Sequence, residues 1–446
     1  MCKAIFDTSL VIKKDRSSSD YFDMRILIYS YNYYPEPIGI APLMTELAEG
    51  LVKRGHQVRV VTAMPNYPER RIYEGYRKKL YLTELKNGVQ IQRSYVWIRP
   101  QPNLIDRVLL DASFAIASFL PALMGWRPDV ILATSLSLPV CVPTALLGWL
   151  QGCPVVLNLQ DILPEAAIHV GILKNQLLIK AFTALEKFAY RTATKISVIA
   201  DGFVENLQAK NVEASKIAQI PNWVDVNFIR PLPTENNTFR AAHNLNDKFV
   251  ILYSGNIALT QGLETVVKAA SALRHIPDIA FVIVGEAKGL QRLQQECQNC
   301  GADNVLLLPF QPREKLPEML AAADVGLVVQ KKNVISFNMP SKIQVLLASG
   351  RALVASVPEN GTAARAIKQS GGGIIVPPED PGTLANAILD LYKHPEKVKT
   401  LGYNSRQYAV EQYAFEQALN HYESLFYTVT SDSPAIGSTI VSKQEV

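Results

Sequence analysis

Cysteine is scarce in this chain, and its pattern argues against a disulfide-rich fold. The 446 residues include five cysteines, an odd and scattered set that favours a reducing compartment over a disulfide framework. Cys297 and Cys300 form a lone CxxC in a polar, helix-like segment. Because no second pair follows at suitable spacing, zinc binding and redox chemistry stay minor alternatives for this motif.

An uninterrupted apolar run that would cross a membrane is also lacking. Residues 104–125 are amphipathic at first and then apolar, and no charged residue lies between Asp129 and Asp161. A transmembrane helix normally needs about 20 consecutive apolar residues, whereas prolines break the uncharged stretch into strand, loop, helix and strand. We therefore expect burial between layers, with residues 105–124 dipping into a membrane face, rather than a span.

The start of the chain lacks the features of a secretory signal. Residues 1–23 are polar and contain no apolar run followed by a cleavage site, so we expect a disordered leader there. The fold is expected to begin at Met24. Residues 431–446 are expected to form a disordered tail.

Composition and charge indicate a globular protein with an anionic partner. Hydrophobic residues make up 48% and charged residues 19%, and the length predicts two or three domains. The net charge is +5, and residues 24–126 alone hold 13 Lys or Arg against 8 Asp or Glu. This bias favours an anionic membrane surface or a phosphate-bearing lipid. Nucleic acid is the weaker alternative, because no basic run is interleaved with aromatics.

The N-terminal half reads as alternating strands and helices. A strand (RILIYSY), a Pro/Gly loop, a helix ending at Arg54-Gly55 and a second strand (QVRVVTA) form a βαβ unit, which predicts a parallel sheet. Ligands of such sheets collect at the C-terminal ends of the strands, where residues 31–40 would lie. Gly39 would let a substrate approach the backbone closely. The loop has one glycine where a dinucleotide fingerprint needs three.

The second half repeats this rhythm after a polar stretch. We predict an N-terminal domain over 24–233, a linker over 234–247, a second domain over 248–400, and C-terminal helices over 401–430 that pack back toward the first domain. The fold class is α/β, with two Rossmann-like, doubly wound parallel sheets facing across a cleft.

A loop after a predicted strand, QDILPEAAIHVG, carries three polar side chains with two interpretations. Asp161, Glu165 or His169 could face a reaction centre at the strand end. Alternatively they cap the following helix, with Glu165 in its first turn. Asp161 is the strongest functional candidate of the three.

The stretch from Asn333 to Ser356 predicts a phosphate site. It reads as loop, short helix, glycine stop and buried strand, with Pro340 suited to the first helical turn and Gly350 to the position after the last. Free backbone N–H groups at the helix start, together with Lys342, suit a phosphate or diphosphate. The plainer alternative is a strand–helix unit whose lysine is solvated.

The ordered set of segments in the second half resembles retaining GT-B glycosyltransferases of family four. The segments are SGNIALTQGLETVVKA, FVIVGEAKGLQRL, VLLLPFQPREKLPEMLAAADVGLVV, MPSKIQVLLASGRALVAS and GGGIIVPPEDPGTLANAILDLY. PIGIAPLMTELAEGLVKRGHQVRVVT and PNWVD in the first half are similar to that family as well. NLQDILPE and MPSK resemble a branch that builds exopolysaccharide or O-antigen units, including the colanic-acid type.

The resemblance implies a reaction between the two domains, with the sugar nucleotide on the second and the acceptor on the first. Lys342 would supply positive charge to the leaving diphosphate, and Asp161 would face the donor. Gly39 and Ile40 would lie on the acceptor side. The implied donor site comprises Gly255, Asn256, Gln261, Gly262, Gly285, Glu286, Asn338, Met339, Pro340, Ser341 and Val345.

Two departures from the family pattern stand out. Phe337 and Val345 occupy the positions of two glutamates that family members place eight residues apart. Asn256 and Gln261 stand where many members have an arginine and a lysine on the diphosphate. Ribose contacts and positive charge must then come from elsewhere in the chain.

We therefore predict a sugar-nucleotide-dependent, hexosyl-type glycosyltransferase that acts on a polyprenyl-diphosphate-linked glycan in exopolysaccharide or lipopolysaccharide synthesis. It is expected to be cytoplasmic and peripheral at the inner face of the plasma membrane. No cofactor is expected, and no metal, because paired carboxylates with metal-ligand spacing are lacking. The alternatives are a sugar-nucleotide epimerase or a phosphorylase on the same scaffold, or a non-catalytic partner of an active transferase.

Overall fold

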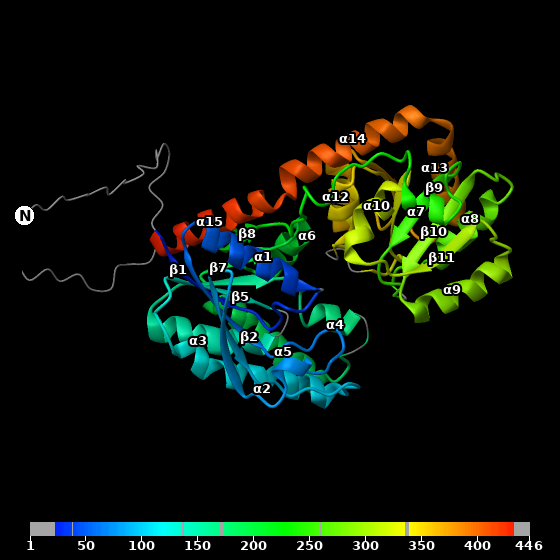
Figure 1. The fold of residues 1–446 in the computed structure, drawn as a ribbon. Helices are drawn as coiled ribbons and strands as arrows, with labels where there is room; N and C mark the ends of the chain where they lie inside the picture. Colours follow the sequence, from blue (N-terminus) through cyan, green and yellow to red (C-terminus); the bar gives the residue numbers. More distant parts are fainter. Residues whose placement is uncertain are drawn as a thin grey trace, which may run out of the picture.

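The computed structural model describes residues 23–431 apart from 38, 136–137, 170, 172, 259 and 335–338. The expected leader and tail lie outside the described residues, except for Asp23 and Ser431 at their inner ends. Two α/β domains lie side by side, each built on its own sheet (Figure 1). The predicted fold class is confirmed.

The first domain contains an eight-stranded sheet in the order β3-β4-β2-β1-β5-β6-β7-β8. Its strands are β1 (Arg25–Tyr29), β2 (Gln57–Ala63), β3 (Tyr81–Lys86), β4 (Val89–Ser94), β5 (Val130–Thr134), β6 (Val155–Leu159), β7 (Lys195–Val198) and β8 (Ile217–Gln219). All pairings are parallel except that of β3 with β4. Their C-terminal ends, except that of β3, therefore share one edge of the sheet.

The antiparallel edge strand β3 is a departure from the expected parallel sheet. Asn87 and Gly88 connect β3 to β4, and both have positive φ angles, 49° and 81°. An Asn-Gly pair with both φ angles positive is typical of a tight hairpin turn. The exposed and half-buried residues of β3 alternate, which is typical of an edge strand with one solvated face.

The second domain contains a six-stranded parallel sheet in the order β11-β10-β9-β12-β13-β14. Its strands are β9 (Phe249–Ser254), β10 (Ile279–Gly285), β11 (Val305–Pro309), β12 (Val325–Val329), β13 (Ala352–Ser356) and β14 (Gly373–Val376). The apolar residues of the four inner strands are mostly buried on both faces, which suits a sheet covered by helices on each side, whereas the edge strands β11 and β14 are largely half-buried.

Helices cover both faces of each sheet. On the first sheet, α2 (Leu104–Leu123), α3 (Cys141–Gln151), α5 (Gln176–Thr192) and α6 (Asp201–Ala209) enclose one core, and α1 (Ile40–Lys53) and α15 (Phe415–Ser431) enclose the other. On the second sheet, α8 (Glu264–Leu273), α9 (Ala287–Cys300) and α13 (Pro381–Lys393) cover one face. The opposite face is covered by α7 (Thr238–Ala242), α10 (Leu316–Ala321), α11 (Lys342–Ala348), α12 (Thr362–Ser370) and α14 (Pro395–Gln412).

The chain crosses from the second domain back to the first near its end. Helix α14 packs on the second domain, and the following helix α15 lies against α1 of the first (Figure 1). Leu419, Tyr422 and Phe426 of α15 are almost fully buried in the first-domain core. Arg54 and His56 of the first domain both contact Glu423 of α15.

The polar stretch 234–247 is more than a connection, because it contains α7 and packs on the second sheet. Arg240 is buried and donates hydrogen bonds to Asp324 Oδ2 at 2.7 Å and to Ala322 O at 2.9 Å. A buried guanidinium that is paired in this way holds the segment in place.

The apolar helix α2 is one of the helices that cover the first sheet. None of the described helices has the length and apolarity that crossing a membrane requires. Phe114 and Ala122 of α2 are buried in the first-domain core, whereas several of its other apolar side chains are exposed.

Candidate active site between the two domains

The strand order of the second sheet puts a topological switch point between β9 and β12, and the crevice at such a point is the expected ligand site. The chain proceeds from β9 to β10 and β11 on one side, and from β12 to β13 and β14 on the other. In open parallel sheets, ligands bind outside the C-terminal strand ends at such a switch point. Gly255 directly follows β9, whereas Gln330 and then Lys331 follow β12. Gln330 is buried, and Lys331 is half-buried.

Lys342 reaches from α11 into this crevice. Its Nζ lies 3.6 Å from the centre of the Tyr253 ring. A Cβ atom at Gly255 would lie only 3.1 Å from Nζ, and Gly255 has a φ of 144°. The glycine therefore leaves room for the amine at the end of β9. The structure thus brings together Gly255 and Lys342, two residues that the sequence analysis assigned to one site.

The amine of Lys342 is buried and has no hydrogen-bond partner among the described residues. Burial lowers the pKa of this lysine from 10.5 to about 7, because the charged form loses its hydration. Contact with the Tyr253 ring face provides some attraction for the ammonium form. A buried amine of this kind is held ready for an anion, since an anionic ligand would restore its charge.

The start of helix α11 differs from the prediction. The helix begins at Lys342, so Pro340 lies before it, and the Ile343 N–H donates to Pro340 O at 3.1 Å. One of the amides expected to be free is therefore occupied. Ile343, Leu346 and Leu347 are buried as their helical spacing predicts, and Gly350 ends the segment with a φ of 66°.

The loops after β9 and β10 hold each other in place. Glu286 Oε2 accepts a hydrogen bond from the Ile257 N–H at 2.9 Å, and the Tyr253 hydroxyl donates to Asn256 O at 2.7 Å. A Cβ at Gly285 would lie 2.4 Å from Ile257 Cδ1, so only glycine fits there. Glu286 thus holds the backbone of the glycine turn by a hydrogen bond. The Asn256 side chain is exposed.

A second lysine, which the sequence analysis did not select, lies beside Gly262. The Cγ atom of Lys331 would lie 3.0 Å from a Cβ at Gly262, and the Lys331 N–H donates to Thr260 O at 3.0 Å. Gln261 Oε1 is buried and has no hydrogen-bond partner in the described part of the chain. Lys331 is therefore a further source of positive charge at the crevice. Its position two residues after the end of β12 was the available signal.

The remaining predicted donor residues fall around α11. Met339 packs against core residues of both domains. Ser341 is exposed, and Val345 is half-buried against the second-domain core. Asn338 and Phe337 lie outside the described residues.

The two domains also meet next to Met339. Arg365 of α12 forms an ion pair with Asp201 of α6 at 3.0 Å and contacts Glu205 of the same helix. A hollow of about 140 Å³ between the domains is lined by residues of both, including Asp201, Met339 and Thr362.

On the first domain, the two predicted acceptor residues, Gly39 and Ile40, lie in different environments. Gly39 precedes α1 with a φ of 73° and is exposed. Ile40 was predicted to contact the acceptor, but its side chain is 5% exposed and packs in the core with Met44 and Leu47. Ile40 starts the buried face of α1, so its side chain is covered by the core in this structure.

Asp161 follows β6 and lies at the same sheet edge as Gly39. It is exposed and makes no hydrogen bond or ion pair with a described residue. Neighbouring protein atoms still displace enough water to raise the pKa of its carboxyl above the usual value. Asp161 is therefore available to a ligand.

Glu165 and His169 lie at the two ends of the short helix α4 (Glu165–His169). Glu165 is in the first turn of α4, where it pairs with Lys210 at 2.9 Å and accepts from Asn206 at 2.8 Å. The first-turn position of Glu165 agrees with the capping alternative, but these bonds join its carboxylate to side chains at α6 and its C-terminal end. His169 is exposed at the end of the same helix.

The CxxC pair gives no metal centre. Cys297 and Cys300 are free thiols at the end of α9. Within the described ranges, no group of three or more His, Cys, Asp or Glu side chains is arranged to hold a metal ion.

Comparison with known proteins gives the same division of the chain. Residues 39–223 match the model of a glycosyl transferase 4-like domain, and residues 235–408 match that of the glycosyl transferases group 1. The putative colanic acid biosynthesis glycosyl transferase WcaI of Escherichia coli K12 is 35% identical over 335 residues, which cover 73% of this chain and 82% of that protein. The O-antigen chain mannosyltransferase C of Escherichia coli is 23% identical over 91% of this chain and 99% of its own length.

Solved structures agree in fold. The Anabaena protein HepE, solved in complex with UDP, superposes with a TM-score of 0.68 at 15% identity, covering 91% of this chain and 100% of that one. Sucrose-phosphate synthase from Thermosynechococcus elongatus gives a TM-score of 0.69 at 17% identity, covering 92% of this chain and 99% of that one. From the family models and the 35% identical relative, we conclude that the chain belongs to the family-four glycosyltransferases of GT-B fold.

Proposed function

We propose that this protein is a retaining glycosyltransferase that moves a sugar, of hexosyl type, from a nucleotide-sugar donor to a lipid-linked glycan in exopolysaccharide or lipopolysaccharide synthesis. The relatives named for colanic acid and O-antigen synthesis support this class of acceptor. Structures of similar fold that were solved with UDP or UDP-glucose support a nucleotide-sugar donor. Neither a metal nor a cofactor is part of the proposal.

The observation that carries the proposal is the buried, unpartnered amine of Lys342 at the switch point of the second sheet. When the bond between sugar and diphosphate breaks, negative charge grows on the leaving diphosphate. A cation that is already fixed in a site shielded from water stabilises that charge strongly. Lys342 would supply it, and Gly255 would let the diphosphate approach the backbone. Lys331 would add charge where Gln261 replaces the usual lysine.

The acceptor would bind at the facing edge of the first domain. Asp161 is exposed there and has no hydrogen-bond or ion-pair partner among the described residues, so its carboxylate is free to contact the acceptor or the transferred sugar. Gly39 would allow close approach at the end of β1.

The test is release of nucleoside diphosphate from a sugar nucleotide in the presence of a polyprenyl-diphosphate-linked glycan. A thermal-shift screen with UDP-sugars and GDP-sugars should first identify the donor, because a ligand that binds only the native protein raises its melting temperature. That donor should then be consumed only when the acceptor is present. Conversion of the donor without any acceptor would favour an epimerase, and the absence of binding to every sugar nucleotide would contradict the proposal.

Donor affinity is expected to fall as the pH rises above about 7. The pKa of Lys342 is about 7 in the free protein, and the diphosphate of a sugar nucleotide selects the protonated amine. Above pH 7 the protein must take up a proton when it binds, so the dissociation constant should rise toward about tenfold per pH unit. Tyr253 stays neutral here because burial raises its pKa, and Glu286 is hydrogen bonded to the Ile257 N–H. Calorimetry in two buffers of different ionisation enthalpy measures the proton uptake. Affinity that does not vary between pH 7 and 9 would show that the amine is not at the diphosphate.

A further inference from the structure

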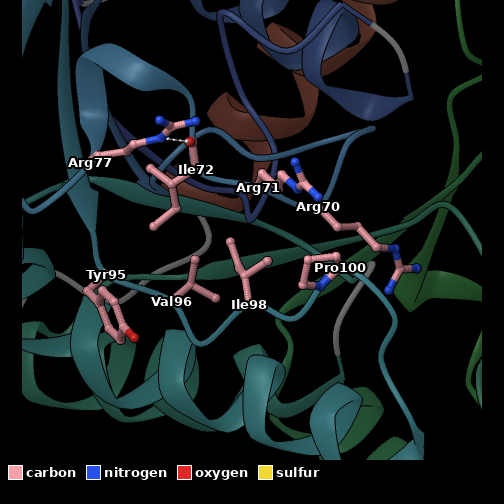
Figure 2. A pocket seen from close by; sticks show the side chains of 8 residues that line it. All are labelled: Arg70, Arg71, Ile72, Arg77, Tyr95, Val96, Ile98 and Pro100. Carbon is pink, nitrogen blue, oxygen red and sulfur yellow. Dashed lines mark hydrogen bonds between the residues drawn. The ribbon is translucent and has the colours of Figure 1, made fainter.

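A hollow of about 380 Å³ on the first domain combines positive charge with apolar walls. Three arginines, Arg70, Arg71 and Arg77, line it together with Ile72, and residues 95–100 form the facing wall (Figure 2). The contributors from that facing wall are Tyr95, Val96, Ile98 and Pro100. Both segments follow the C-terminal ends of strands, β2 in one case and β4 in the other. The hollow therefore lies at the same sheet edge as Gly39 and Asp161.

The three guanidinium groups have no carboxylate partner. No ion pair joins Arg70, Arg71 or Arg77 to an acid of the described chain, and the hollow is lined by no Asp or Glu. The side-chain hydrogen bond found among them is that from Arg77 Nε to Ile72 O at 3.1 Å. Three unpaired arginines in one hollow create a strongly positive potential, and their planar donors suit phosphate oxygens.

A buried carboxylate, that of Glu36, holds the segment that carries the arginines. Glu36 is 4% exposed, and its Oε1 accepts from the Asn66 and Tyr67 N–H groups at 2.7 and 2.8 Å. The carboxylate thus fixes the backbone three and four residues before Arg70. On the other side, the Trp97 N–H donates to Ser113 Oγ of α2 at 2.8 Å, which fixes the apolar wall on that helix. The hollow is therefore formed before any ligand arrives.

An apolar stripe on α2 continues from this wall. Ile105, Leu109, Ile116 and Leu120 share one face of the helix and are 68%, 44%, 77% and 57% exposed. Exposed apolar residues that are contiguous over a whole helix indicate a binding surface or contact with a membrane. Trp97 lies beside the hollow with Arg99 stacked 5.0 Å from its ring centre, an arrangement suited to a membrane interface.

We propose that this hollow binds the diphosphate of the lipid-linked acceptor, and that the lipid chain lies along the α2 stripe at the membrane surface. The arginines match the charge of the diphosphate, and the stripe matches the apolar chain that leaves it. Because the hollow shares a sheet edge with Asp161, the glycan end of such a lipid would point along that edge. The inference builds on the proposed transfer reaction and names the residues that select its acceptor.

The test compares a double variant, Arg70→Gln with Arg71→Gln, with a control that loses the same charge elsewhere. The control is Lys268→Gln with Lys288→Gln, two exposed lysines of the second domain without ion-pair partners. Binding is measured with phosphatidylcholine vesicles that contain either polyprenyl diphosphate or phosphatidylglycerol, at equal total charge. Geranyl diphosphate serves as a soluble probe of the hollow without a membrane.

The parent protein should prefer polyprenyl diphosphate vesicles, and the arginine variant should lose this preference by about tenfold or more, as expected for charge-assisted bonds. It should bind geranyl diphosphate correspondingly less well, whereas the control should keep both properties. Equal losses on both kinds of vesicle, or no loss beyond that of the control, would overturn the proposal. The single variant Arg71→Gln, at an exposed position, repeats the test if the double variant proves unstable.

Measuring donor binding distinguishes a failure of the proposed lipid site from a failure of the proposed transfer reaction. The thermal shift with the sugar nucleotide should be the same for the arginine variant and the parent, since the donor site lies on the other domain. Loss of lipid selectivity with intact donor binding supports the acceptor site. A parent protein that binds the lipid diphosphate selectively but binds no sugar nucleotide would contradict the proposed reaction and leave the lipid site standing.

Discussion

Replacing Lys342 by methionine is expected to lower the rate of sugar transfer by about 10²–10³-fold, the usual cost of removing one preorganised group that stabilises developing negative charge. Methionine keeps the length and apolar character of the side chain, so the packing against Tyr253 should survive. The measurement is release of nucleoside diphosphate with saturating acceptor. Donor affinity should fall as well, because the bound diphosphate already carries negative charge, and turnover should fall further because the diphosphate gains charge as the bond breaks.

Lys332→Met is the matched control for this experiment. Lys332 lies in the same connection after β12, but its side chain is exposed. Its backbone N–H donates to Glu379, a bond that the substitution keeps. Its removal should change the rate less than about twofold, as for most surface charges. Similar losses in both variants would show that Lys342 contributes only to the overall positive charge of the protein and has no specific role at the diphosphate.

The Lys342→Met variant is also expected to be more stable than the parent protein. The pKa of Lys342 is about 7 in the folded chain and 10.5 in a free side chain, so the unfolded chain binds more protons between these values. Stability of the parent must therefore rise with pH across that window. Lys342→Met should be stabilised most below pH 7, by about 1–3 kcal/mol, the typical cost of a buried polar group without a partner. The difference should become smaller as the pH rises toward 10.5, because the part that depends on the charge of the amine is lost across this window. Thermal unfolding at several pH values measures it.

Phe426→Ala is expected to destabilise the first domain by about 3–5 kcal/mol, the range for removing a buried phenyl ring. Phe426 lies on α15, is fully buried, and packs with residues of α1 and the first sheet. The unfolding transition of the first domain should move to a lower temperature, while stabilisation of the second domain by sugar nucleotide should persist. Calorimetry with and without the donor separates the two transitions.

Phe310→Ala serves as its control, because that ring is 54% exposed at the end of β11. Loss of an exposed ring should cost less than about 0.5 kcal/mol. If Phe426→Ala lowered both transitions together, the two domains would unfold as one cooperative unit.

Local patterns predicted the strand and helix order well, because apolar runs and glycine stops act within a few residues. The segment around Lys342 shows this: the buried face of α11, Gly350 and the strand β13 all follow from spacing and residue type. The hairpin at Asn87-Gly88 was missed although its signal was present. The helix start was placed two residues early, since the Pro340 carbonyl accepts the first amide.

The environment of the site residues depends on packing between distant segments and was not predictable. Sequence alone leaves open whether Lys342 is solvated, since the answer depends on Tyr253 and Gly255 some ninety positions earlier. The burial of Ile40 depends on where α1 meets the sheet. The basic character of the first half was visible, but the absence of acid partners for Arg70 and Arg71 becomes clear only in three dimensions.

The return of α15 to the first sheet affects how the protein matures on the ribosome. The core around α1 needs Leu419, Tyr422 and Phe426, which are translated after every strand of both sheets. The second sheet and its helices through α14 are complete before those residues emerge. We therefore expect the second domain to reach its native state first during synthesis, while the first domain, although its strands are translated earlier, can complete its core only after α15 has been made.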